Sequence, residues 1–178
     1  MSTTISTIYS FKSGATYSSS EAPSNLVDGT TSNKMCITNF SSLGNFWVIL
    51  VAGTPLVLSS TYQLWAAGDS VNDPKRHPKN FVIQGRNDLS NWTTLTRVTN
   101  LPAWTTNYGK YTYTLTNPST SAFRFFRLNV TANYGDGNLQ IGELVLTGDP
   151  PRVSKRYNSL LPRFTRDIGY IQAPAEEI

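Results

Sequence analysis

The chain has 178 residues and a mass of 19.7 kDa, a length typical of one domain with room for a short appendage. Thr, Ser and Asn occupy 56 positions, whereas the 15 basic and 11 acidic residues occupy only 26. This balance disfavours long surface helices, which need Glu, Lys, Arg and Ala, and favours Thr-rich and aromatic-rich strands. It excludes an all-α fold, and the 39% of hydrophobic residues exclude an intrinsically disordered chain.

The net charge of +4 is unevenly spread. Residues 1–148 carry ten basic and seven acidic side chains, and residues 149–178 carry five and four. A surface that follows nucleic-acid phosphates needs many clustered Lys and Arg side chains. Nucleic acid is therefore not an expected partner of the main body.

Cysteine usage and the N-terminal residues indicate the compartment of folding. Cys36 is the single cysteine, so no intrachain disulfide can form. The first residues lack the basic and apolar regions of a secretory signal, and no apolar run approaches the roughly 18 residues of a membrane span. We expect synthesis and folding in a reducing cytoplasm, without a signal peptide or a membrane span.

Alternation of apolar and polar residues dominates the chain. In residues 110–116, Tyr111, Tyr113 and Leu115 share one face and three threonines share the other, as a half-buried antiparallel strand requires. Eight such segments are expected to be strands: 5–11, 46–51, 62–66, 80–85, 93–98, 110–116, 122–130 and 139–146. Gly, Pro, Asn and Asp separate them. The prediction is an all-β fold, an antiparallel jelly-roll β-sandwich of about eight strands, spanning residues 1–148.

Residues 149–178 are expected to form an extended C-terminal arm used for assembly. Pro150 and Pro151 interrupt ladder hydrogen bonding, because proline has no amide hydrogen. The residues that follow show neither strand nor helix periodicity, yet they carry many apolar groups, which a solvated linker would avoid. The residues expected to make assembly contacts are Arg152, Tyr157, Leu160, Leu161, Phe164, Ile168, Tyr170 and Ile171. The alternative is an unstructured tail.

Catalysis has little support in the sequence. His77 is the single histidine and lies in a loop between prolines, without the glycine pattern of a nucleophile elbow. A zinc site would need more His and Cys than the chain holds. Asp69, Asp73, Asp136 and Glu143 could pair for glycoside cleavage, but turn formation explains such acids equally well. We expect the protein not to be an enzyme.

The order of several segments resembles a discoidin domain. The segments are the Asp-Gly turn of 22–29, the apolar run 46–50, Asp-Pro-Lys at 73–75, the strand and turn of 79–88, Asn-Trp at 91–95, and the closing runs 123–128 and 139–144. This family, also called the coagulation-factor C-terminal type, includes the family 32 carbohydrate-binding modules. The resemblance covers residues 8–148. It implies a galactose-binding-like sandwich that binds ligands through loops at one end.

The resemblance also implies a structural calcium ion near the Asp-Gly turn. The oxygen donors would come from Asn25, Asp28, Thr30, Asn33 and Glu143, in part through backbone carbonyls. Taken alone, the segment 24–33 also fits an ordinary Asp-Gly turn. The chain departs from the family where Met35-Cys36-Ile37 stands in a region that often holds a tryptophan.

A sugar site would combine an aromatic platform with charged and amide groups that reach sugar hydroxyls. The loop residues expected to supply them are Asp73, Arg76, His77, Trp104, Asn107, Tyr108 and Tyr134. The alternative is that these residues pack within the loops.

Folding without export or disulfides suits a virion protein assembled in a bacterial cytoplasm and released by lysis. The expected function is therefore a non-catalytic bacteriophage head or tail component, anchored to other virion subunits through residues 149–178 in an oligomeric assembly and adhering to cell-surface glycans. One alternative is a glycan-binding module of a bacterial carbohydrate-active system. Another is a purely structural decoration subunit with no ligand.

Overall fold

The computed structural model describes residues 2–88 and 91–152. The strands are β1 (Thr3–Thr4), β2 (Ile8–Phe11), β3 (Met35–Ile37), β4 (Phe46–Leu58), β5 (Thr61–Trp65), β6 (Pro78–Arg86), β7 (Thr93–Val98), β8 (Lys110–Thr114), β9 (Phe123–Asn133), β10 (Leu139–Ile141), β11 (Glu143–Val145) and β12 (Thr147–Asp149). The helices are short: α1 (Phe40–Leu43) and the 3-10 turns η1 (Ser19–Glu21), η2 (Pro23–Val27) and η3 (Pro74–Arg76).

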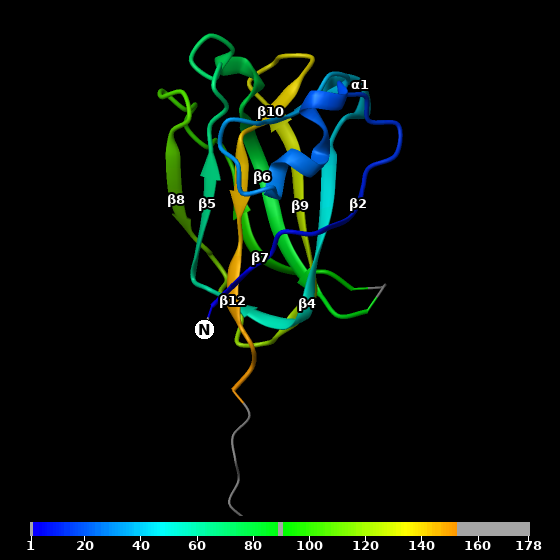
Figure 1. The fold of residues 1–178 in the computed structure, drawn as a ribbon, viewed down its shortest axis with the longest axis vertical. Helices are drawn as coiled ribbons and strands as arrows, with labels where there is room; N and C mark the ends of the chain where they lie inside the picture. The colour runs from blue at the N-terminus through cyan, green and yellow to red at the C-terminus, as the bar shows by residue number, and fades with distance from the viewer. Residues whose placement is uncertain (1, 89–90, 153–178) are drawn as a thin grey trace, which may run out of the picture.

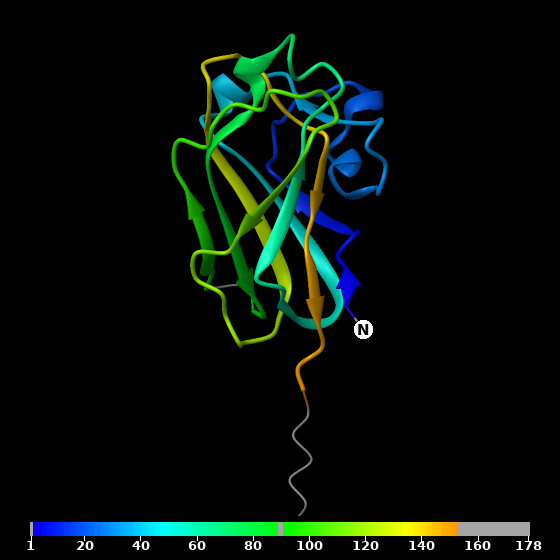
Figure 2. The same cartoon turned by 90° about the vertical axis from the view of Figure 1, so that its left-hand side faces the viewer.

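Two antiparallel layers face each other (Figures 1 and 2). The larger sheet has seven strands in the order β1-β12-β4-β9-β6-β7, with β2 also paired to β4. The smaller sheet has the order β11-β5-β8, and β10 and β3 form a separate pair. The predicted all-β antiparallel sandwich is confirmed.

The core lies between the two layers and follows from alternation along the central strands. On β4, Phe46, Val48 and Leu50 are buried, and on β9 the same holds for Phe126 and Leu128. Every second side chain therefore leaves the water, which is the dominant favourable contribution to folding. Several outward positions, such as Trp47 on β4 and Arg127 on β9, stay partly exposed.

The structure differs from the expected strands at the segment 139–146. It divides into β10 and β11 at Gly142, whose amide donates a hydrogen bond to the Trp65 carbonyl at 2.8 Å. A Cβ on Gly142 would lie 2.7 Å from the Ala66 carbonyl oxygen, so only glycine allows this approach. β3 was not expected either, because its three residues are all buried and show no alternation.

Loops and short helices gather at one end of the sandwich, and β12 lies near the opposite end (Figure 1). β12 ends at Asp149, directly before Pro150. The predicted arm contacts beyond Arg152 lie outside the described residues. Within the described part of the chain, no helix has the length and apolar character needed to cross a membrane.

Candidate functional site

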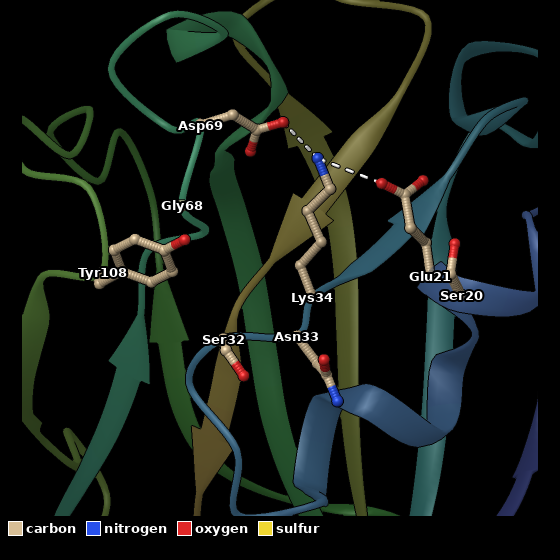
Figure 3. A pocket seen from close by; sticks show the side chains of 8 residues that line it. All are labelled: Ser20, Glu21, Ser32, Asn33, Lys34, Gly68, Asp69 and Tyr108. Atoms are coloured by element: carbon tan, nitrogen blue, oxygen red, sulfur yellow. Dashed lines mark hydrogen bonds and ion pairs between the residues drawn. The ribbon is translucent and has the colours of Figure 1, made fainter.

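An open polar pocket of about 500 Å³ lies at the loop end of the sandwich (Figure 3). It joins segments that are far apart in the sequence: the turn η1, the residues before β3, the loop after β5 and the loop before β8. Its lining residues are Ser20, Glu21, Ser32, Asn33, Lys34, Gly68, Asp69 and Tyr108. We call it the loop-end pocket.

Lys34 is the charged centre of the loop-end pocket. Its ammonium group forms ion pairs with Asp69 and, at 3.3 Å, with Glu21, and it donates to Gln140 Oε1 at 3.3 Å. Burial alone would lower the pKa of Lys34, but the hydrogen bond and charge of Asp69, together with Glu21, outweigh burial and raise it. Lys34 therefore stays charged and holds two carboxylates at fixed places, as Figure 3 shows.

Tyr108 forms the aromatic wall opposite Lys34 and is 50% exposed. Its φ of +56° lies in the left-handed region, which costs a tyrosine on the order of 1 kcal/mol. Two hydrogen bonds hold this conformation: Tyr108 donates its amide to the Ala67 carbonyl at 3.2 Å, and the amide of Val71 donates to Asn107 Oδ1 at 2.8 Å. The ring lies against Gly68, where any Cβ would overlap it.

Two of the residues expected to touch a sugar are buried instead. His77 is 1% exposed and Trp104 is 2% exposed. The Trp104 amide donates to His77 Nδ1 at 3.0 Å, and Trp104 also stacks on Tyr111 at 5.6 Å and donates its indole N–H to the Tyr113 hydroxyl at 3.0 Å. Their side chains support the loops and offer no surface to a ligand.

The other expected sugar-binding residues clamp neighbouring loops together. Arg76 Nη1 contacts Asp73 Oδ2 at 2.9 Å, and its Nε lies 3.6 Å from Asp136 Oδ2. Tyr134 donates its hydroxyl to the Leu101 carbonyl. Of the residues expected to bind sugar, Tyr108 lines the loop-end pocket. Asn107 does not line it, but its side chain accepts a hydrogen bond from the Val71 amide and so helps to fix the loop that carries Tyr108.

Acid is expected to weaken the fold through His77. Burial lowers the pKa of its imidazole below the usual value of about 6.5, although Ser70 and the charges of Asp69 and Asp73 oppose this. A depressed folded-state pKa means that the stability contribution is present above pH 6.5 and is lost as pH falls below it. Urea unfolding between pH 7.5 and 5 should show this loss in the native protein and much less of it in His77→Asn, which keeps an acceptor but does not titrate.

Glu143 titrates in the same range with the opposite trend, because burial raises its pKa to about 7. Glu143 is present in both proteins, so its contribution cancels when the free energy of unfolding of His77→Asn is subtracted from that of the native protein at each pH. Equal pH dependence of the two proteins would contradict the assignment to His77.

Four of the five predicted calcium ligands lie around the Asp-Gly turn: Asp28, Thr30, Asn33 and Glu143. Glu143 Oε1 accepts the Gly29 amide at 3.1 Å, while its Oε2 is buried without a hydrogen-bond partner among the described residues. Asp28 directly precedes Gly29, so its carboxylate and that of Glu143 lie at the same turn. Burial raises the pKa of Glu143, and the charge of Asp28 adds to this. Asp28 accepts the Thr30 amide at 2.8 Å and the Asn33 side-chain amide at 3.0 Å.

A hard cation fits this arrangement. Ca²⁺ would be bound by the two carboxylates and would give the buried Oε2 of Glu143 a partner. Loop carbonyls and water would complete its six to eight oxygen ligands. Asn25 would contribute only its carbonyl, because its side-chain amide already donates to the carbonyls of Ser20 and Lys34. No group of three or more His, Cys, Asp or Glu side chains suited to a metal occurs in the described residues.

The four acids that could have formed a catalytic pair each have a polar partner, and two of them share Arg76. Asp69 binds Lys34, Asp73 and Asp136 bind Arg76, and Glu143 faces Gly29. The arrangement suits binding through hydrogen bonds and an aromatic ring.

Comparison with solved structures places this fold among known domains. The chain is similar to the F5/8 type C domain of a Bacteroides fragilis protein (TM-score 0.59, 15% identity, covering 74% of this chain and 83% of that one). It is equally similar to the family 32 carbohydrate-binding module of Streptococcus pneumoniae EndoD (TM-score 0.59, 18% identity, 81% and 98% covered). A Clostridium perfringens family 32 module in complex with GalNAc-β-1,3-galactose gives a TM-score of 0.57 (9% identity, 82% and 93% covered).

These likenesses show that the chain has the fold of discoidin-type and family 32 carbohydrate-binding domains. No protein-family profile matches the sequence, and no curated protein matches it.

Proposed function

We propose that this protein is a non-catalytic glycan-binding module and that the loop-end pocket holds the sugar. The observation that carries the proposal is Tyr108, half-exposed and held in a left-handed backbone conformation beside a polar pocket. Structures with this fold include modules described as binding carbohydrate, which supports a glycan over other small ligands.

The pocket has the two parts that sugar recognition needs. The ring of Tyr108 offers an apolar face for the C–H groups of a pyranose. Glu21, Lys34 and Asp69 offer charge-assisted acceptors and donors for hydroxyl groups, and Ser32 and Asn33 add neutral ones. Because the ion pairs fix the charged groups before binding, little side-chain entropy is lost when the sugar arrives.

Replacing Tyr108 with alanine should weaken glycan binding by about tenfold, the equivalent of about 1.4 kcal/mol. The measurement is a glycan array that includes chitosan oligomers and GalNAc-β-1,3-galactose, followed by calorimetry on the best neutral ligand. Gly68→Ala should weaken binding similarly, because the new Cβ displaces the Tyr108 ring. Tyr9→Ala is the matched control, since Tyr9 is 57% exposed but does not line the pocket. Full binding by both Tyr108→Ala and Gly68→Ala would exclude the loop-end pocket as the sugar site.

We also propose that Asp28 and Glu143 hold a structural calcium ion that fixes the loop between η2 and β3. The buried, unpartnered Oε2 of Glu143 supports this proposal. The ion would pin the loop that leads to Asn33 and Lys34 and so would help to shape the loop-end pocket. It would supply no chemistry to a bound sugar.

Attachment to a bacteriophage virion through residues 149–178 stays a prediction. Most of that segment lies outside the described residues, and the fold agrees better with the alternative of a glycan-binding module. Assembly into an oligomer and location in a virion likewise remain predictions from the sequence.

A further inference from the structure

Arginines and aromatic rings gather on the outer face of the larger sheet. Arg86 lies opposite Phe125 in the register of β6 and β9, and Gln84 lies opposite Arg127. The ring of Trp92 contacts both arginines, with guanidinium carbons 4.2 Å (Arg86) and 4.4 Å (Arg127) from its centroid. Together with Arg124, whose guanidinium lies 6.0 Å from the Phe125 ring, these residues form what we call the sheet-face cluster.

The sheet-face cluster concentrates positive charge. Arg127 donates Nε and Nη2 to the neutral Gln84 Oε1, at 2.9 and 2.5 Å. Among residues 2–88 and 91–152, neither Arg124 nor Arg127 lies within ion-pair distance of a carboxylate, whereas Lys34 and Arg76 at the loop end do. Burial lowers the pKa of Arg127, and the like charge of Arg86 lowers it further. A negatively charged partner would relieve this repulsion.

We propose that the sheet-face cluster binds an anionic polysaccharide, with sugar carboxylates seated on Arg124 and Arg127. The planar guanidinium group matches a carboxylate in two parallel hydrogen bonds. The neutral amides beside the arginines are held in place: Gln84 donates to Thr94 at 3.4 Å, and Asn129, which follows Arg127 on the same face of β9, accepts from Asn45 at 2.9 Å. The site is separate from the loop-end pocket and does not depend on it.

Two other anionic partners fit less well. An extended acidic peptide would bind by pairing with a free strand edge. β6 and β9 have none, because β6 is flanked by β7 and β9, and β9 by β4 and β6; the nearest free edge, on β7, is separated from Arg124 and Arg127 on β9 by β6. Single-stranded nucleic acid would need open ring faces for stacked bases. Two guanidinium groups already lie within 4.4 Å of the centroid of the Trp92 ring, and Phe125 meets Tyr9 edge-on at 5.2 Å.

The test measures binding of the full chain to polygalacturonate and to the same polymer with its carboxylates converted to methyl esters. The native protein should bind the acid, less tightly as salt rises, and should not bind the ester. Arg124→Gln, at an exposed position, should weaken binding roughly threefold, and the double variant Arg124→Gln with Arg127→Gln on the order of 30-fold. Lys110→Gln, on β8 of the smaller sheet, removes the same charge and is the control.

Three results would overturn the proposal. The first is equal weakening by Lys110→Gln and Arg124→Gln, which would mean non-specific attraction. The second is equal binding of the methyl ester. The third is tighter binding of poly-glutamate or a thymidine oligonucleotide than of polygalacturonate, which would assign the face to a different class of partner. Failure here is read from Arg124→Gln on polygalacturonate, whereas failure of the loop-end pocket is read from Tyr108→Ala on a neutral glycan, so the two are distinguishable.

Discussion

Replacing Trp104 with alanine is expected to lower the free energy of unfolding by about 3–5 kcal/mol, the usual cost of truncating a buried tryptophan. The side chain is 2% exposed, stacks on Tyr111, contacts the His77 ring at 4.9 Å and donates to the Tyr113 hydroxyl. Its loss leaves a cavity and an unpaired hydroxyl beneath the loops that carry Tyr108. For a domain of this size, the melting temperature should fall by on the order of 10 °C.

The same variant separates the two roles that the sequence allowed for Trp104. If Trp104 were a surface platform for sugar, the Trp104→Ala protein would lose glycan binding and keep the native melting temperature, as we expect for Tyr108→Ala. Trp104→Phe provides the graded control, because it keeps most of the stacking with Tyr111 and loses only the indole hydrogen bond, at about 1–2 kcal/mol. A melting temperature within 2 °C of the native value for Trp104→Ala, judged against the few degrees that each kcal/mol is worth, would contradict the buried role.

Alternation predicted the strands whose two faces differ in exposure. Tyr111 and Tyr113 on β8 are half-buried while their threonine neighbours are exposed, as the pattern of 110–116 requires. β3 has no such contrast, because Met35, Cys36 and Ile37 are all buried. The break at Gly142 could not be predicted locally either, since it depends on the carbonyls of residues more than seventy positions earlier in the chain.

The candidate site was harder to predict because it depends on which loops meet. His77 and Trp104 have residue types found in sugar sites, but their burial is set by each other and by β8. Lys34 follows the segment interpreted as a calcium turn, and Asp69 opens the loop expected to bind sugar. Their pairing spans 35 positions and leaves no spacing motif in the sequence.

Calcium is expected to stabilise the fold strongly. At a concentration of about 100 times its Kd, a bound ion adds about 2.7 kcal/mol to the free energy of unfolding, on the order of 5–10 °C in melting temperature. The measurement compares thermal unfolding in excess calcium and in a chelator. Identical melting temperatures in both conditions would exclude the ion.

The substitution Glu143→Gln makes the calcium test specific, because its expected effect changes sign with the ion. With calcium, the variant loses a charged ligand and should melt below the native protein. In chelator, the native Glu143 is a buried carboxyl next to Asp28 with a pKa of about 7, so a neutral amide removes an unfavourable charge and should melt at the same temperature or higher. Glu21→Gln removes the same charge at the loop-end pocket, which neither Asp28 nor Glu143 lines, and should keep the full calcium response. A Glu143→Gln protein that responds to calcium like the native one would place the ion elsewhere. A variant that is less stable in chelator as well would mean that the charge of the Glu143 carboxylate strengthens its hydrogen bond from the Gly29 amide.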